Sequence, residues 1–236
     1  MTYVLPIIVG SHSNRILIMI NSIIEEGKAS FINIIKSYDL AKIDFKKGEF
    51  LYKQGQPVCS LYWVTKGEFS IKHTEINGKS INLGVIESNE RFFGEIEFVS
   101  GQLAKFDLVA NCDVSVKIIT HEEMIEIINA DYKVSLWLSN CIARSYDQIT
   151  NSMFTMTLYP LIYNIALDLK QRYSGEKESV GYDVITQEAE RFGCSDRVYH
   201  RVVKELVSRK LVQKSKQGLS IVNYRELCEF IDSFGS

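Results

Sequence analysis

The sequence predicts an α+β protein built from an N-terminal β-roll, a long helix and a C-terminal winged helix-turn-helix, in that order. Three observations support this prediction. Glycines interrupt short stretches of alternating apolar residues throughout residues 48–101, residues 132–157 contain neither glycine nor proline, and residues 186–222 follow a pattern of helix, tight turn, helix and hairpin. With 236 residues, the chain is long enough for one or two domains with their own hydrophobic cores.

These features divide the chain into four parts. Residues 1–30 are predicted to be an N-terminal extension with an amphipathic helix at residues 16–24. Residues 31–131 are predicted to form the β-roll, residues 132–157 the long helix, and residues 158–236 the winged helix-turn-helix. Proline is tolerated in the first turn of a helix, so we expect a hinge at residues 157–160 before a helix that begins near Pro160.

The β-roll is predicted to open with a short helix at residues 31–38 and to continue with about eight short strands. Alternating apolar residues mark the strands at residues 43–45, 50–52, 61–64, 69–71, 81–85, 108–110 and 114–119. Asn77 and Gly78 suit the two positive-φ positions of a type I′ hairpin turn. Thr120 and Glu123 have the spacing of a capping box, which predicts a helix after the last strand.

Composition and residue spacing exclude several classes of protein. The five cysteines show neither metal-ligand spacing nor disulfide-like density, which favours the reducing cytoplasm. The four histidines lie on separate segments, so neither a metal-dependent barrel enzyme nor a Ser-His-Asp hydrolase is expected. The apolar runs at residues 4–9 and 16–24 are too short to cross a bilayer, and we expect no signal peptide. We therefore predict a cytoplasmic protein that is not an enzyme and does not bind a membrane.

The long helix carries a candidate dimer interface. Six residues follow the 4-3 spacing of a two-chain coiled-coil seam: Leu138, Ile142, Ser145, Ile149, Ser152 and Met156. The alternative is that this face packs on the β-roll of its own chain. A helix of about 39 Å is longer than a domain is wide, which favours the dimer.

The helix-turn-helix pattern begins at Thr186, which is suited to cap the first helix. Ala189 provides the small side chain that two closely crossing helices need. Gly193 is suited to the left-handed conformation of the turn, and Ser195 to the N-cap of the second helix. Apolar residues with helical spacing point one face of the second helix inward, so its outward face carries Arg197, His200, Arg201 and Lys204.

This outward face indicates a surface that meets phosphates. Residues 191–216 contain eight basic residues against two acidic ones, in a chain whose net charge is −2. A basic cluster alone would more simply be a solvated helix face. Here, however, a hairpin at residues 211–222 follows the two helices, and a helix-turn-helix followed by a hairpin is a winged helix. We therefore expect DNA binding. The candidate residues are Ser195, Asp196, Arg197, His200, Arg201, Lys204, Lys214 and Lys216.

The order β-roll, long helix, hinge and winged helix resembles the cyclic-AMP receptor protein and FNR superfamily of bacterial transcription regulators, from about Phe31 onward. The most specific matches are residues 48–55, residues 93–96 and residues 193–195 together with Arg201. The resemblance implies a jelly roll of the cyclic-nucleotide-binding type. It also implies a homodimer, double-stranded DNA with a near-palindromic site, and RNA polymerase as a further partner. By this resemblance Arg201 contacts a guanine edge or a phosphate, and Ser195 a backbone phosphate.

The same resemblance points to an effector pocket at Gly94, Glu95, Lys105 and Phe106. Relatives that bind cyclic nucleotides have an arginine and then a hydroxyl residue at the last two positions, and Glu97 adds a negative charge where a small residue is usual. We therefore do not expect cyclic AMP as the effector. No cysteine precedes Cys59, so no iron-sulfur cluster of the FNR type is expected, and His73 alone does not indicate haem. No cofactor or metal is predicted, and the effector is unknown or absent.

The function that these observations predict is a homodimeric, sequence-specific transcription regulator. The alternative is a cyclic-nucleotide-binding regulatory module that acts through a protein partner. The basic recognition helix argues against this alternative, because such a module has no need of one. We expect any effector to act by changing the dimer seam and, through the hinge, the spacing of the two recognition helices.

Overall fold

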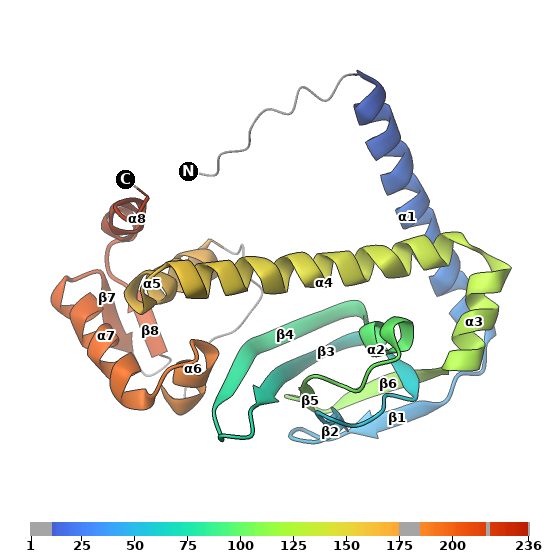
Figure 1. Ribbon diagram of the computed structural model, residues 1–236, viewed down its shortest axis with the longest axis horizontal. Helices are drawn as coiled ribbons and strands as arrows, with labels where there is room; N and C mark the ends of the chain where they lie inside the picture. The colour runs from blue at the N-terminus through green and yellow to red at the C-terminus, as the bar shows by residue number, and fades with distance from the viewer. Residues whose placement is uncertain (1–10, 175–184, 216–217, 236) are drawn as a thin grey trace.

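The computed structural model describes residues 11–174, 185–215 and 218–235. A long helix, α4, forms a rod, with the β-domain along one side and the winged helix at its C-terminal end (Figure 1). The elements are α1 (Ser11–Ser37), β1 (Lys42–Phe45), β2 (Phe50–Tyr52), β3 (Ser60–Thr74), β4 (Ser80–Phe93), α2 (Glu95–Ser100), β5 (Asp107–Ala110), β6 (Val114–Thr120), α3 (His121–Ala130), α4 (Lys133–Leu158), α5 (Leu161–Tyr173), α6 (Ile185–Arg191), α7 (Asp196–Ser208), β7 (Val212–Ser215), β8 (Gly218–Ile221) and α8 (Tyr224–Asp232). The predicted fold class is confirmed.

The β-domain is organised around β3. This strand pairs with β4 along its length, with β6 at its start and with β5 at its end, all antiparallel. The two strands predicted at residues 61–64 and 69–71 are therefore one. Gly67 lies between them, and the strand continues through it. A side chain at this position would press against Val114 and Phe69, which explains why the residue is glycine. This glycine marks a close approach and not a turn, so six strands take the place of the eight predicted before the long helix.

The turn between β3 and β4 differs from the type I′ prediction. Gly78 has a φ of 79°, but Asn77 does not have positive φ. The Gly78 N–H donates to the Glu75 carbonyl oxygen at 2.9 Å, which closes a four-residue turn one step earlier along the chain. The Asn77 side chain accepts a hydrogen bond from the Lys79 N–H at 3.0 Å. Asparagine therefore stabilises this turn through its amide oxygen and not through a positive φ.

One continuous helix, α1, replaces the two helices predicted at residues 16–24 and 31–38. It passes through Gly27, and a side chain at this position would overlap the Lys133 carbonyl oxygen of α4. The glycine thus lets two helices cross closely. The boundary predicted between residues 30 and 31 falls inside α1.

An aromatic cluster joins α1, the sheet and α4. Phe31 has no exposed surface, and its ring centroid lies 5.0 Å from Trp63, 4.7 Å from Phe92 and 5.0 Å from Trp137. Edge-to-face and tilted ring pairs at such distances add stabilisation beyond the burial of their area. The N-terminal third of α4 is therefore part of the core of the β-domain.

The helices after the sheet begin and end close to the predicted positions. Thr120 and Glu123 form the capping box of α3. Helix α4 has 26 residues, one position later than predicted. The chain turns at Tyr159 and Pro160, both extended, and α5 begins at Leu161.

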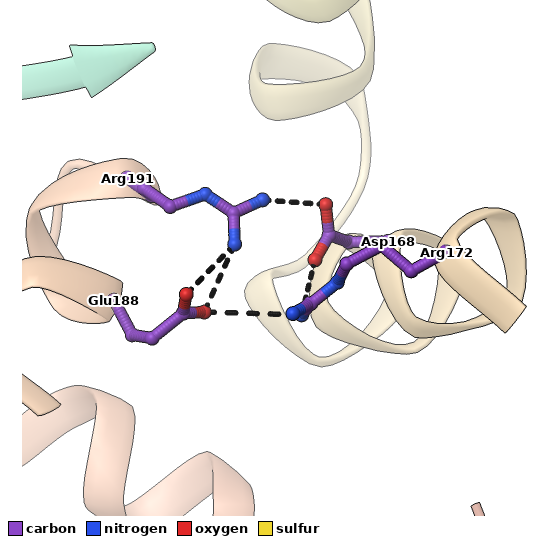
Figure 2. Close-up of polar contacts among 4 residues, drawn as sticks. All are labelled: Asp168, Arg172, Glu188 and Arg191. Carbon is purple, nitrogen blue, oxygen red and sulfur yellow. Dashed lines mark hydrogen bonds and ion pairs between the residues drawn. The ribbon is translucent and has the colours of Figure 1, made fainter. Parts of the chain in front are cut away.

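In the C-terminal domain, a buried ion network holds α6 against α5 (Figure 2). The Arg191 guanidinium donates to Glu188 at 2.9 and 3.0 Å and to Asp168 at 2.6 Å, while Arg172 contacts the other Asp168 oxygen at 2.6 Å. Arg191 is 5% exposed. The prediction of an outward-facing basic cluster is thus wrong for this residue, because two carboxylates on the inner sides of α5 and α6 draw it into the core.

We expect Arg191→Met to lower the free energy of unfolding of the C-terminal domain by about 3 kcal/mol, the lower end of the range for breaking a buried ion pair, because Arg172 still contacts Asp168. Urea unfolding followed by far-ultraviolet circular dichroism measures this loss.

The matched control is Arg209→Met. Arg209 is half exposed and forms an (i, i+4) pair with Glu205 at 2.8 Å, so its loss should change stability by less than about 0.5 kcal/mol. Equal effects of the two substitutions would contradict a structural role for the buried network.

Candidate nucleic-acid interface and effector pocket

Helix α7 separates a buried apolar face from an exposed polar one. Tyr199, Val203 and Leu206 are buried against the rest of the domain. Arg197, Arg201 and Lys204 lie at positions i, i+4 and i+7 and are all exposed. Three cations therefore share the outward face, as the sequence predicts. His200 is half-buried beside this face, and Asp196 is exposed in the first turn of the helix.

The turn before α7 fixes the direction of this helix. Gly193 has a φ of 60°, and the Cys194 N–H donates to the Ala189 carbonyl oxygen at 3.0 Å, which closes the end of α6. Ala189 is fully buried. Ser195 occupies the N-cap position of α7 with extended backbone, but its side chain makes no capping hydrogen bond. Its exposed hydroxyl lies at the positive end of the helix. Because α6 begins at Ile185, the N-cap predicted at Thr186 falls inside the helix instead.

A two-stranded wing follows α7. Strands β7 and β8 pair antiparallel, from Val212 opposite Ile221 to Ser215 opposite Gly218. Lys210 has a φ of 59°, an uncommon conformation for a residue with a side chain, and it reverses the chain between α7 and the wing. Lys214 is exposed on β7, whereas Lys216 lies outside the described residues.

The predicted effector pocket contains a buried carboxyl group. Gly94, with a φ of 89°, precedes α2, and a side chain there would crowd the Ser60 carbonyl oxygen. Glu95 is 6% exposed, and burial raises its pKa to about 7, with Arg91 acting in the opposite direction. Both residues of the Gly-Glu pair are therefore enclosed by the fold of the β-domain.

The other pocket positions differ from those of a phosphate site. The Glu97 carboxylate is hydrogen-bonded to the Lys105 backbone; burial raises its pKa, and the Lys105 charge opposes this rise. A carboxylate of the chain itself thus lies beside the lysine that would meet a phosphate. The Phe106 ring packs on His73, with centroids 5.8 Å apart, and the His73 ring also contacts the Lys105 carbonyl oxygen. At this end of the predicted pocket, Phe106 therefore contributes an apolar ring contact, and Lys105 contributes a backbone hydrogen bond to His73.

Residues that the sequence did not single out complete this region. Arg91 on β4 donates to the Ser145 hydroxyl of α4 at 3.5 Å, and its guanidinium lies 5.5 Å from the Phe93 ring centroid. Tyr52 is half-buried close to both acidic residues of α2, and the burial of its hydroxyl raises its pKa well above the ordinary value. Arg91 thus joins the pocket region to α4. Its only sequence signal is an arginine directly before the apolar pair Phe92 and Phe93.

The candidate dimer residues share one face of α4 but differ in what covers them along the helix. Leu138 is 3% exposed, in the core with Trp137, and Ser145 faces Arg91. For these two residues the structure matches the alternative, in which the helix packs on its own β-domain. The remaining four point less toward the β-domain: Ile142 and Met156 are half-buried, and Ile149 and Ser152 are exposed.

The two domains also touch directly. The Lys72 ammonium on β3 donates to both Glu190 oxygens on α6, at 3.1 and 3.0 Å, and the Ser80 hydroxyl on β4 donates to Glu190 at 3.0 Å. Lys72 and Glu190 are partly buried, with side-chain exposures of 35% and 26%. The turn end of the β3–β4 hairpin therefore contacts α6, the first helix of the helix-turn-helix (Figure 1).

Within the described residues, no helix has the length and apolar content needed to span a membrane, and no three metal-ligating side chains gather into a site.

Residues 42–131 match the family model of the cyclic nucleotide-binding domain. No curated protein matches the chain at the sequence level. Among solved structures, a CRP/FNR-family transcriptional regulator from Eubacterium rectale superposes with a TM-score of 0.67 at 16% identity, over 82% of this chain and 90% of that one. The c-di-GMP-responsive global regulator CLP from Xanthomonas campestris superposes with a TM-score of 0.64 at 16% identity, over 84% of this chain and 99% of that one. FixK2 from Bradyrhizobium japonicum superposes with a TM-score of 0.62 at 14% identity, over 81% of this chain and 97% of that one. At these identities the likeness establishes the fold.

We expect Glu190→Gln to loosen the contact between the domains, because it removes the charge that holds Lys72. A partly exposed ion pair is worth about 1 kcal/mol, so amide hydrogen exchange in α6 and at the hairpin end should rise about fivefold. Glu229→Gln, which breaks an exposed pair with Arg225 on α8, is the control and should leave both regions unchanged. Equal exchange in the two variants would contradict this contact.

Proposed function

Because the chain has the fold of the CRP/FNR transcription regulators, we propose that it is a homodimeric regulator that binds a specific DNA sequence in the cytoplasm. The observation that carries this proposal is the exposed cationic face of α7, held outward by a helix-turn-helix and followed by a wing. No enzymatic activity is proposed. Whether transcription rises or falls depends on where the site lies relative to the RNA polymerase that the resemblance implies as a partner.

Arg201 is the residue we assign to base recognition. It lies in the middle of the exposed face of α7, between Arg197 and Lys204, and no ion pair to a carboxylate within the described residues neutralises it. A guanidinium there can donate two parallel hydrogen bonds to a guanine edge in the major groove. Ser195 is assigned to a backbone phosphate, because its hydroxyl and the N-terminus of α7 are both presented to solvent.

The remaining cations are assigned to phosphates. Arg197, Lys204 and Lys214 are exposed on α7 and the wing. Each phosphate neutralised releases a counterion, so binding should weaken with salt at a log-log slope of about −0.9 per contact. His200, half-buried at the side of the helix, and Asp196, negative at its first turn, are less suited to phosphates. Both flank the cationic face, and we assign them to sequence preference.

The dimer seam that we propose follows an apolar stripe of α4. Ile142, Tyr146, Ile149, Met153 and Met156 have 4-3-4-3 spacing and so share one face. Tyr146, Ile149 and Met153 are 67%, 41% and 54% exposed in the single chain. This stripe keeps three of the six residues predicted from sequence. It leaves out Leu138 and Ser145, which face the β-domain, and the exposed, polar Ser152. Pairing two stripes would place the recognition helices about one turn of DNA apart, which suits a near-palindromic site.

We propose that the effector, if one exists, is not cyclic AMP. The Glu97 carboxylate lies beside Lys105, so a cyclic phosphate would meet a negative charge and would lose the arginine and hydroxyl that bind it in relatives. The Lys72–Glu190 contact offers a second route, besides the hinge, by which the β-domain can orient the winged helix.

Selection of bound fragments from random DNA by the purified protein tests this function, with and without added cyclic AMP. We expect a two-fold symmetric motif in both conditions. Failure to enrich any motif, together with DNA binding that does not depend on salt, would favour the alternative of a regulatory module that acts on a protein partner.

On the selected site, Arg201→Ala should cost about 1–3 kcal/mol and relax the base preference at one position of each half-site, because one pair of hydrogen bonds to a base edge is lost. Binding isotherms on single-base variants of the site measure both effects. Arg225→Ala removes the same side chain from α8, where it is 88% exposed, and should change neither. Wild-type affinity and preference in the Arg201 variant would overturn the assignment.

We expect Met153→Glu to raise the dimer dissociation constant at least about 100-fold, because the seam would have to bury two unpaired carboxylates. Analytical ultracentrifugation measures this change. Gln148→Glu introduces the same charge at an exposed position off the stripe and should leave the dimer intact. A dimer as strong in the Met153 variant as in the control would place the interface elsewhere.

A further inference from the structure

The N-terminal half of α1 stands away from the rest of the chain. The C-terminal half packs on α4 and the sheet through Ile24, Phe31 and Ile35, which are buried. Figure 1 shows the N-terminal half rising beyond α4 on the side opposite the sheet. From Gly27 back to Ser11 the helix extends about 24 Å at 1.5 Å per residue. We call residues 11–23 the arm.

The direction of the arm is set by contacts at its base. Gly27 crosses against the Lys133 carbonyl oxygen at the start of α4, and the Lys133 ammonium contacts Glu26 at 2.8 Å. On the neighbouring turn, Lys28 contacts Glu90 at the end of β4 at 3.0 Å. Close helix contact and two ion pairs therefore anchor the arm to both α4 and the sheet.

The arm is apolar on more than one side. Ile16, Ile18, Met19 and Ile20 are 55%, 68%, 58% and 39% exposed, and four such residues within five positions of a helix point in several directions. A helix that is hydrophobic all round is normally buried. Residues 16–24 carry no charge, and Glu25 and Glu26 follow them. Helices that lie on membranes carry lysine and arginine on a polar face, so this composition favours a protein surface.

We propose that the arm packs on the second copy of this chain and completes the dimer seam at its N-terminal end. This inference rests on the proposed dimer. The axis of a partner helix in the seam lies 8–10 Å away, well within the reach of a helix that extends about 24 Å from Gly27. The arm also starts where the seam is weakest: the stripe of α4 continues backward through Ser139 and Ser135, which offer little apolar surface. The arm, which lies beside this end of the stripe, carries the apolar surface that the two serines lack.

The test compares Ile18→Glu/Met19→Glu with Asn33→Glu in the full chain. Both substituted arm residues are exposed in the single chain, so their replacement should leave folding unchanged, as circular dichroism and the melting temperature would report. We expect the dimer dissociation constant to rise at least tenfold in the arm variant. Asn33 is exposed on the anchored half of α1, and its variant should match the wild type.

A photo-crosslinking residue at position 18 provides a second, direct measurement. We expect crosslinked dimers in the wild-type background and their loss when Met153→Glu is added. A dimer with unchanged dissociation constant in the arm variant, and no crosslink, would overturn the role of the arm while leaving the seam on α4 intact. A wild-type chain that is monomeric at micromolar concentration would instead overturn the proposed dimer itself. Loss of binding to phosphatidylglycerol vesicles in the arm variant, with the dimer unchanged, would assign the arm to a membrane and overturn the inference.

Discussion

The aromatic cluster around Phe31 is the interaction on which the arrangement of the molecule depends. The Phe31 ring of α1 lies 5.0 Å from Trp63 and 4.7 Å from Phe92 of the sheet and 5.0 Å from Trp137 of α4, and the two tryptophan rings lie 6.1 Å apart. Because two of the rings belong to the sheet, one to α1 and one to α4, this buried cluster sets the directions of both helices relative to the sheet. The path of α4 determines where the winged helix lies, and the path of α1 determines where its apolar arm points. Both proposed contacts with a second subunit follow from this core.

The arginines of the C-terminal domain show how surroundings decide what a charge does. Arg191 is enclosed by Asp168 and Glu188, where it joins α6 to α5. Arg201, ten residues later, lies on the exposed face of the next helix, with no ion pair to a carboxylate within the described residues. The first arginine stabilises the helix-turn-helix, and the second is available to a phosphate or a base. Mutating them should therefore separate stability from DNA recognition, although both belong to the same basic stretch of sequence.

The β-domain combines the fold of a cyclic nucleotide-binding domain with two acidic residues in the first turn of α2. Glu95 is buried and its pKa is about 7, while Glu97 accepts a hydrogen bond from the Lys105 backbone. The resemblance places the cyclic phosphate in this region, so the chain supplies its own anion there. Arg91 links the same region to α4 through Ser145, and Lys72 links the far end of the hairpin to Glu190. This region is thus connected by direct contacts to α4 and to the first helix of the helix-turn-helix.

The sequence by itself determined the features that depend on local spacing. The order of domains, the capping box at Thr120, the 26-residue helix, the left-handed turn at Gly193 and the apolar face of α7 all follow from residues within a few turns of one another. What depends on distant partners was decided only by the tertiary structure. Gly27 and Gly67 resemble breaks between elements, but each lies where another segment approaches too closely for a side chain. Leu138 has seam spacing, yet it faces the sheet, because helical periodicity defines a stripe without saying which neighbour covers it. For the same reason Arg191 could not be told from Arg201 until Asp168, far away in the sequence, was placed beside it.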